Sequence, residues 1–148
     1  MINGEVRTAA DLVLSATRTL EAAAAEPTAA KRYVAAHLAA MRAAAAVLAV
    51  RARPRRGAGE RPRGVWVLLG AVAPELGEWS RFFALTAGKR AAAEAGVAAA
   101  VSPREADDMV REAATFLDLA IASVGARSAA SGTDGRLESV GRAAGKVG

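Results

Sequence analysis

The residue in this chain best suited to acid–base chemistry is its single histidine, His37, in the segment KRYVAAH. Imidazole has an unperturbed pKa close to neutrality, so small changes in its surroundings switch its charge. Arg32 lies five positions earlier. A five-residue step rotates roughly 140° around a helix, so the two side chains do not stack, but both can border one groove near the start of a helix.

The surroundings of His37 also allow a purely structural role. Tyr33 and Met41 lie four residues away on either side, which places all three residues on one stripe of a helix. A histidine on an apolar stripe is usually packed in the core and hydrogen-bonded through one nitrogen. A backbone carbonyl or the Tyr33 hydroxyl is the expected partner. The residues alone leave the chemical and the structural interpretation open.

The composition limits the kinds of protein this chain can be. Its 148 residues suit one domain, and 41 of them are alanine, so the core depends on a few large side chains. The absence of cysteine excludes disulfides and thiolate metal sites, and one histidine makes a zinc site improbable. The longest apolar run, Val65 to Ala73, is too short to cross a bilayer. We therefore expect a cytoplasmic protein with no membrane association, no metal and no cofactor.

Turn residues and caps divide the chain into helices. The first is expected from Thr8, a cap with Asp11 three residues later, to just before Pro27. Thr28 can cap the second, which carries the stripe of His37. A third helical region starts at Val65, is interrupted at Pro74 and stops at Gly96.

The fourth helix has the strongest local signal. In SPRE, Ser102 is the cap, Pro103 the first helical residue and Glu105 the residue that reaches back to the cap. Gly125 is expected to end this helix, and the glycine- and serine-rich remainder is expected to be disordered. The sequence thus predicts an all-α fold, an up-and-down four-helix bundle over residues 1–125, followed by a tail over residues 126–148.

An arginine-rich loop is predicted between the second and third helices. The stretch RARPRRGAGERPR holds six arginines with two prolines and two glycines, a composition that cannot bury a face. Arginines can neutralise phosphates, but an arginine-rich solvated connector is an equally good interpretation. An up-and-down bundle places this loop at the end opposite Arg32. The candidate nucleic-acid-binding residues are Arg51, Arg53, Arg55, Arg56, Arg61 and Arg63.

Several of these segments together resemble a known family. An arginine, four residues and a histidine near the start of a bundle helix, in RYVAAHLAAMRAAAAVLAVRARP, are followed by APELGEW and SPREADDMVREAATFL. This string, from about Thr8 to Val124, resembles the HEPN superfamily, helical domains named for higher-eukaryote and prokaryote nucleotide-binding proteins. It is most similar to a small stand-alone HEPN-like family of actinobacteria. The resemblance implies a helical bundle that associates with RNA or nucleotides.

Catalytic HEPN proteins are metal-independent ribonucleases, and the resemblance implies which residues would act here. His37 would act on the ribose 2′-hydroxyl, and Arg32 would stabilise the charge on the scissile phosphate. One histidine per chain cannot be both base and acid, so this mechanism requires a homodimer. Tyr33 follows the arginine where active members usually have a polar residue. The expected function is an RNA- or nucleotide-associated HEPN module, with an endoribonuclease and a non-catalytic protein-interaction bundle as alternatives, so enzymatic activity is left open.

Overall fold

The computed structural model describes residues 8–51 and 64–144, with side chains described up to residue 130. All regular elements in these residues are helical, which confirms the predicted all-α class for this part of the chain. The elements are α1 (Ala9–Ala25), α2 (Ala29–Arg51), α3 (Val65–Val72), the 3-10 turn η1 (Pro74–Leu76), α4 (Gly77–Glu94) and α5 (Pro103–Ala144).

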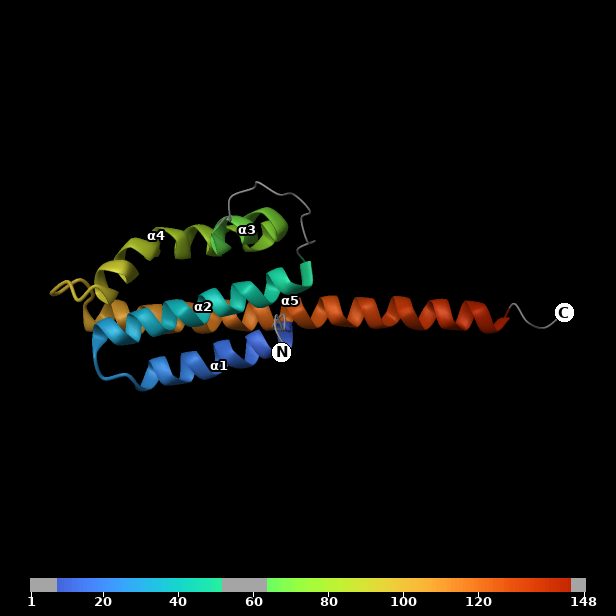
Figure 1. Ribbon diagram of the computed structural model, residues 1–148, viewed down its shortest axis with the longest axis horizontal. Coiled ribbons are helices and arrows are strands. Elements are labelled where there is room, and N and C mark those ends of the chain that lie inside the picture. The colour runs from blue at the N-terminus through green and yellow to red at the C-terminus, as the bar shows by residue number, and fades with distance from the viewer. Residues whose placement is uncertain (1–7, 52–63, 145–148) are drawn as a thin grey trace, which may run out of the picture.

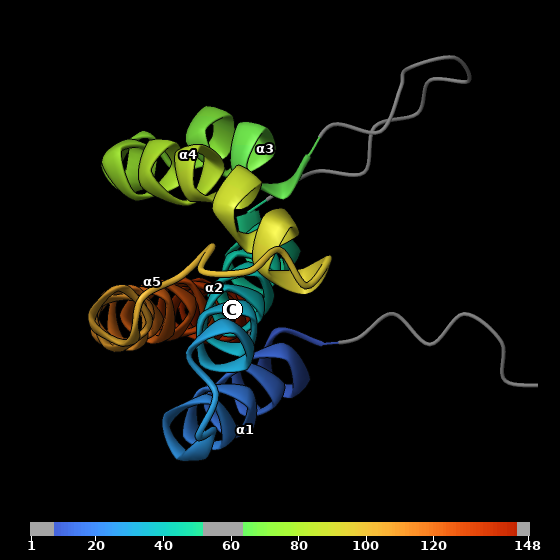
Figure 2. The same cartoon turned by 90° about the vertical axis from the view of Figure 1, so that its left-hand side faces the viewer.

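Helix α2 is the centre of the arrangement. It packs beside α5 and runs in the same direction, with α1 on one side of this pair and α3 and α4 on the other (Figure 1). The end-on view in Figure 2 shows the same order, with α1 and α4 on opposite sides of α2. Along the chain, α1, α2, α4 and α5 alternate in direction. His37, in the first half of α2, therefore lies on the central helix of the fold.

The helix starts follow from caps that the sequence predicts. The Asp11 amide donates to Thr8 Oγ1 at 3.1 Å at the start of α1. At the start of α5 the capping box is complete, since the Glu105 amide donates to Ser102 Oγ at 3.1 Å. The Ser102 amide in turn donates to the Glu105 carboxylate at 3.0 Å. These bonds satisfy helix-terminal amides that otherwise have no partner.

Pro74 divides the third helical region into α3, η1 and α4. A proline disfavours helical geometry in the preceding residue, and Ala73 accordingly has φ −134° and ψ 72°. Helix α4 ends at Glu94, and Gly96, two residues further on, has the positive φ of 79° that favours glycine. The Val97 amide donates to the Ala92 carbonyl at 3.0 Å, which completes a Schellman motif. The sequence predicts both the interruption and the stop.

Two kinds of packing hold the helices together. The buried residues of α1 are Ala16 and Ala23, and those of α2 are mostly alanines. The α4 backbone packs on α2 but not closely on α5. Large rings therefore fill the space between α5 and the α3–α4 pair. The rings that are buried or partly buried there are Trp66, Trp79, Phe82, Phe83 and Phe116.

Within the described residues, α2 is the one helix long and apolar enough to cross a membrane by length and composition alone. Half of its most apolar window is buried inside the bundle. A helix surrounded by α1, α4 and α5 needs the same composition, so this property is weak evidence for a membrane segment.

The last helix is longer than predicted. It does not end at Gly125 but continues to Ala144, beyond the rest of the bundle (Figure 1). This part of α5 contains four glycines, Gly125, Gly132, Gly135 and Gly141, each of which costs a helix interior about 1 kcal/mol, but it contains no proline, which would cost about 3 kcal/mol. Residues 125–130 are all exposed. The division of the chain at residues 125 and 126 stays a prediction.

We predict that a chain ending after Arg127 unfolds in urea with a free energy within about 0.5 kcal/mol of the full chain, because residues 125–130 are all exposed. A chain ending after Phe116 serves as the control. It lacks Leu117 and Ala120, which are buried, and is expected to lose several kcal/mol. Equal losses in the two truncated chains would contradict the predicted boundary.

Candidate functional site

His37 lies in the core, on the side of α2 that faces α3 and α4. Its side chain is fully buried, with 0% exposure. The Nε2 atom lies 3.0 Å from the Phe83 carbonyl oxygen of α4. The imidazole packs edge-on against two rings, with centroids 5.7 Å from Phe83 and 6.1 Å from Trp66. This geometry matches the structural interpretation of His37, with a backbone carbonyl as the partner.

The hydrogen bond determines which nitrogen of the neutral ring carries the proton. A carbonyl only accepts, so Nε2 carries the proton and Nδ1 of the neutral ring is an acceptor. Nδ1 is buried and has no hydrogen-bond partner. Burial lowers the pKa of His37 below 6.5, the Phe83 carbonyl opposes this effect and the positive charge of Arg90 adds to it. At neutral pH the imidazole is therefore uncharged.

Arg32, in the first turn of α2, joins three parts of the fold. Its Nη1 donates to the Glu26 carbonyl at 2.7 Å, in the link between α1 and α2. Its Nε lies 3.0 Å from Oδ1 of Asp107 in α5, as an ion pair in which the N–H is not aligned for a hydrogen bond. The Arg32 side chain is 14% exposed. The guanidinium thus acts as a clamp at one end of the bundle.

The two predicted catalytic residues lie in different interfaces. Arg32 contacts α5 and the α1–α2 link, whereas His37 contacts α3 and α4. This separation agrees with the large rotation between residues five apart on a helix. Within one chain the structure does not bring the pair onto a shared open groove. Their catalytic role stays a prediction.

Sequence reasoning misses Arg90, which acts on His37 from α4. Arg90 Nη1 donates to Glu94 at 2.9 Å, and its Nε is buried without a partner. No local signal relates Arg90 to His37, because they come from different helices. The same is true of Phe83, 46 residues from His37 in the chain. The one sequence signal for Phe83 is its helical spacing from other large apolar side chains. This spacing predicts a position in the core, but not a contact with the imidazole.

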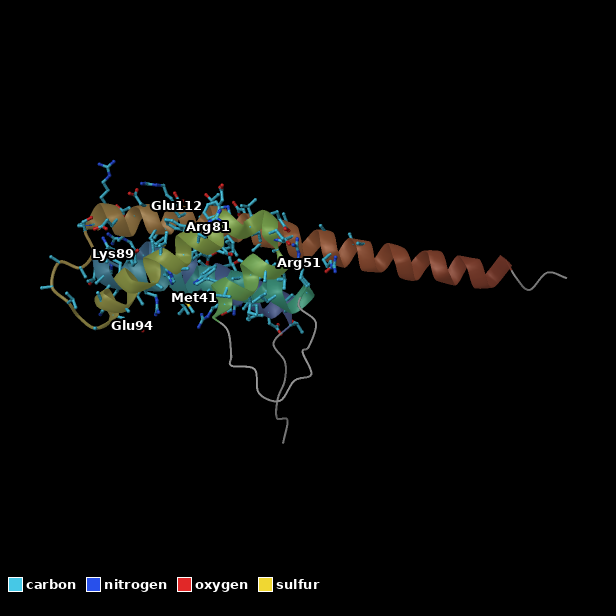
Figure 3. The ribbon with its side chains drawn as sticks, turned by 90° about the horizontal axis from the view of Figure 1, so that it is seen from above. Met41, Arg51, Arg81, Lys89, Glu94 and Glu112 are labelled. Atoms are coloured by element: carbon cyan, nitrogen blue, oxygen red, sulfur yellow. The ribbon has the colours of Figure 1, made fainter. Side chains whose placement is uncertain are left out.

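Of the predicted nucleic-acid-binding arginines, one lies in the described residues. Arg51 donates from Nη2 to Ser123 Oγ at 2.9 Å and pairs with Glu75, so it joins α2, η1 and α5. It is about 28 Å from Arg32 along α2 at 1.5 Å per residue. Figure 3 shows Arg51 at the end of the bundle opposite Lys89 and Glu94. The other candidates, Arg53, Arg55, Arg56, Arg61 and Arg63, lie outside the described residues.

The acidic residues at the start of α5 have structural partners. Glu105 caps the helix and pairs with Lys89, and Asp107 pairs with Arg32. Among the described side chains, in residues 8–51 and 64–130, no three histidine, cysteine or carboxylate groups come together to hold a metal ion. These carboxylates therefore stabilise the junction of α2, α4 and α5.

Comparison with known proteins identifies the class of this helical domain. Its all-helical fold agrees with a HEPN domain, and a family model matches residues 23–120, which is more than half of the chain. The protein belongs to the SAV_6107-like HEPN family. The comparisons with curated proteins and with solved structures gave no significant match.

We predict that Arg32→Ala lowers the free energy of unfolding by about 1–2 kcal/mol, because it removes the Asp107 pair and the bond to the Glu26 carbonyl. The control is Arg104→Ala, an exposed arginine in the first turn of α5, with an expected change within about 0.5 kcal/mol. Urea unfolding followed by circular dichroism measures both changes. If Arg32→Ala lowers the free energy of unfolding no more than Arg104→Ala does, the stabilising role of Arg32 is contradicted.

Proposed function

We propose that this HEPN domain is a non-catalytic module that associates with RNA or nucleotides. The observation that carries the proposal is the complete burial of His37 between α2 and α4. A general base must come within hydrogen-bond reach of the proton it removes, and a sealed imidazole cannot reach a ribose hydroxyl. The clamp position of Arg32 is a second support, because its guanidinium is already held by Asp107 and Glu26.

The charge of the chain supports an association with a polyanion. The formal net charge is +5, and the arginines are most concentrated in the stretch from Arg51 to Arg63. Each cation that contacts a phosphate releases counterions, which gives affinity without sequence preference. No aromatic residue lies within that stretch, so stacking on bases from it is not part of the proposal.

A metal-independent endoribonuclease acting across a homodimer is the second candidate. The observation in its favour is the Nδ1 atom of His37, an acceptor without a partner in an uncharged ring, which is the state a general base requires. This function needs α4 to move away from the ring and a second copy to supply the acid. A protein-interaction bundle is supported only by scattered exposed apolar side chains, of which Leu85 at 83% is the most exposed.

We predict that His37→Ala lowers the free energy of unfolding by about 2 kcal/mol or more, because it leaves a cavity among Trp66 and Phe83. Leu38→Ala, one residue along α2 and 36% exposed, is the control, with an expected loss below about 1 kcal/mol.

The same samples, treated with a chelator, are incubated with RNA and assayed for 2′,3′-cyclic phosphate ends. We expect no cleavage by the unchanged protein or by His37→Ala. Cleavage by the unchanged protein that disappears in a stably folded His37→Ala variant would establish the ribonuclease instead.

We predict that replacing Arg55, Arg56, Arg61 and Arg63 by serine flattens the dependence of single-stranded RNA affinity on salt. The slope of log K against log salt should fall by about 0.7 for each phosphate that is no longer neutralised. The control replaces Arg18, Arg81, Arg104 and Arg111, which are exposed, and changes the net charge equally. Fluorescence anisotropy at several salt concentrations gives both slopes, and equal slopes would refute the role of the arginine stretch.

A further inference from the structure

The layer formed by α3, η1 and α4 is attached to the rest of the bundle differently from α1. Helix α1 packs on α2 and α5 through small side chains, with Ala16 and Ala23 fully buried. The α3–α4 layer packs directly on α2 as well, but toward α5 it rests on rings, with Phe83 and Trp79 centroids 5.3 Å and 5.9 Å from that of Phe116. Such a layer can open as a unit, because α3 and α4 also pack directly on each other.

Polar contacts between this layer and the other helices lie at its two ends and its centre, and a side-chain hydrogen bond also joins Tyr33 of α2 to Thr86 of α4. At the ends, Lys89 pairs with Glu105 of α5, and Glu75 pairs with Arg51 of α2. Both pairs are partly exposed, and such pairs contribute little to stability. At the centre lies the buried hydrogen bond between His37 and the Phe83 carbonyl.

A proton on His37 is not tolerated while the layer is closed. It would have to bind Nδ1, which is buried without an acceptor and surrounded by the Trp66 and Phe83 rings. From α4, the charge of Arg90 repels a protonated ring. On α2 the neighbouring titratable group is Tyr33, which is neutral below pH 7 because burial raises its pKa. Glu105 of α5 acts on Tyr33 and Lys89. Among the described side chains, Arg90 is the charged group that acts on His37, and no carboxylate offsets the new charge.

We propose that the α3–α4 layer is an acid-released cover, which opens away from α1, α2 and α5 when His37 takes up a proton. Opening gives Nδ1 access to water and exposes the ring face formed by Trp66, Trp79 and Phe83. This inference does not depend on the proposed association with RNA. In the opened state the imidazole is accessible to water.

The pH range of the opening follows from the two states of the ring. The opened ring has an ordinary pKa near 6.5, whereas burial lowers the pKa of the closed ring. Opening is therefore unaffected above pH 6.5 and becomes about tenfold more favourable for each pH unit below it, until the pH reaches the pKa of the closed ring. The pKa values of Glu75 and Glu105 lie below 4.5, so the ion pairs at the ends persist through the upper part of this range.

Amide hydrogen exchange of the full chain, read by mass spectrometry between about pH 7.5 and 5, tests the proposal. After correction for intrinsic exchange, protection of peptides from residues 65–94 should fall about tenfold per pH unit below 6.5, while peptides from residues 9–25 and 103–120 keep theirs. Loss of protection in parallel across all helices, or none in residues 65–94, would overturn it.

Two variants separate the role of His37 from general acid sensitivity. His37→Phe keeps an aromatic ring, slightly larger than imidazole, that cannot take up a proton, and the Phe83 carbonyl retains the Thr86 hydroxyl at 3.2 Å as a partner. In the His37→Phe variant, the protection of residues 65–94 against amide exchange should not change with pH. Arg90→Gln keeps His37 but removes the repelling charge, so the total loss of protection should be smaller than in the unchanged protein. Acid opening of His37→Phe or, should that variant not fold, an unaltered response in Arg90→Gln would overturn the proposal.

Discussion

The burial of an uncharged imidazole between two helices is the constraint on which the rest of this structure depends. His37 is the one histidine of the chain, and its bond to the Phe83 carbonyl joins α2 to α4 at the centre of their interface. Because the ring is closed off by Trp66 and Phe83, it belongs to the aromatic core and not to an open surface. Burial keeps the ring neutral. The ring also lies in a different interface from Arg32, which pairs with Asp107 of α5.

The position of α2 explains why most of its buried residues are alanines. A helix that contacts α1, α4 and α5 needs small side chains wherever the backbones approach closely, and six of its nine buried residues are alanines. Alanines bury little area, so the large rings on α3, α4 and α5 supply most of the apolar burial in the other half of the fold. The bundle therefore has a half packed through alanines and a half in which aromatic rings join α3 and α4 to α5, with His37 on the boundary.

The local features of the fold could be predicted from the sequence, and the partners of the candidate site could not. The caps at Thr8 and Ser102, the break at Pro74 and the stop at Gly96 depend on residues within one turn of each other. The partners of His37 and Arg32 come from other helices, so neither Phe83 nor Asp107 is indicated by spacing. Asp107 stands out in the sequence only as part of an acidic cluster that the helix dipole explains. Gly125 is misleading because a glycine ends a helix only where the backbone takes a positive φ, as at Gly96, and α5 continues instead.

The most direct test of this account is the titration of the single imidazole by NMR. With one histidine per chain, the nitrogen shifts of labelled imidazole report one site without assignment. The account predicts a neutral ring with the proton on Nε2 that titrates below pH 6.5. A ring that titrates at about 6.5 or above as a mixture of tautomers, as exposed histidines do, would contradict it.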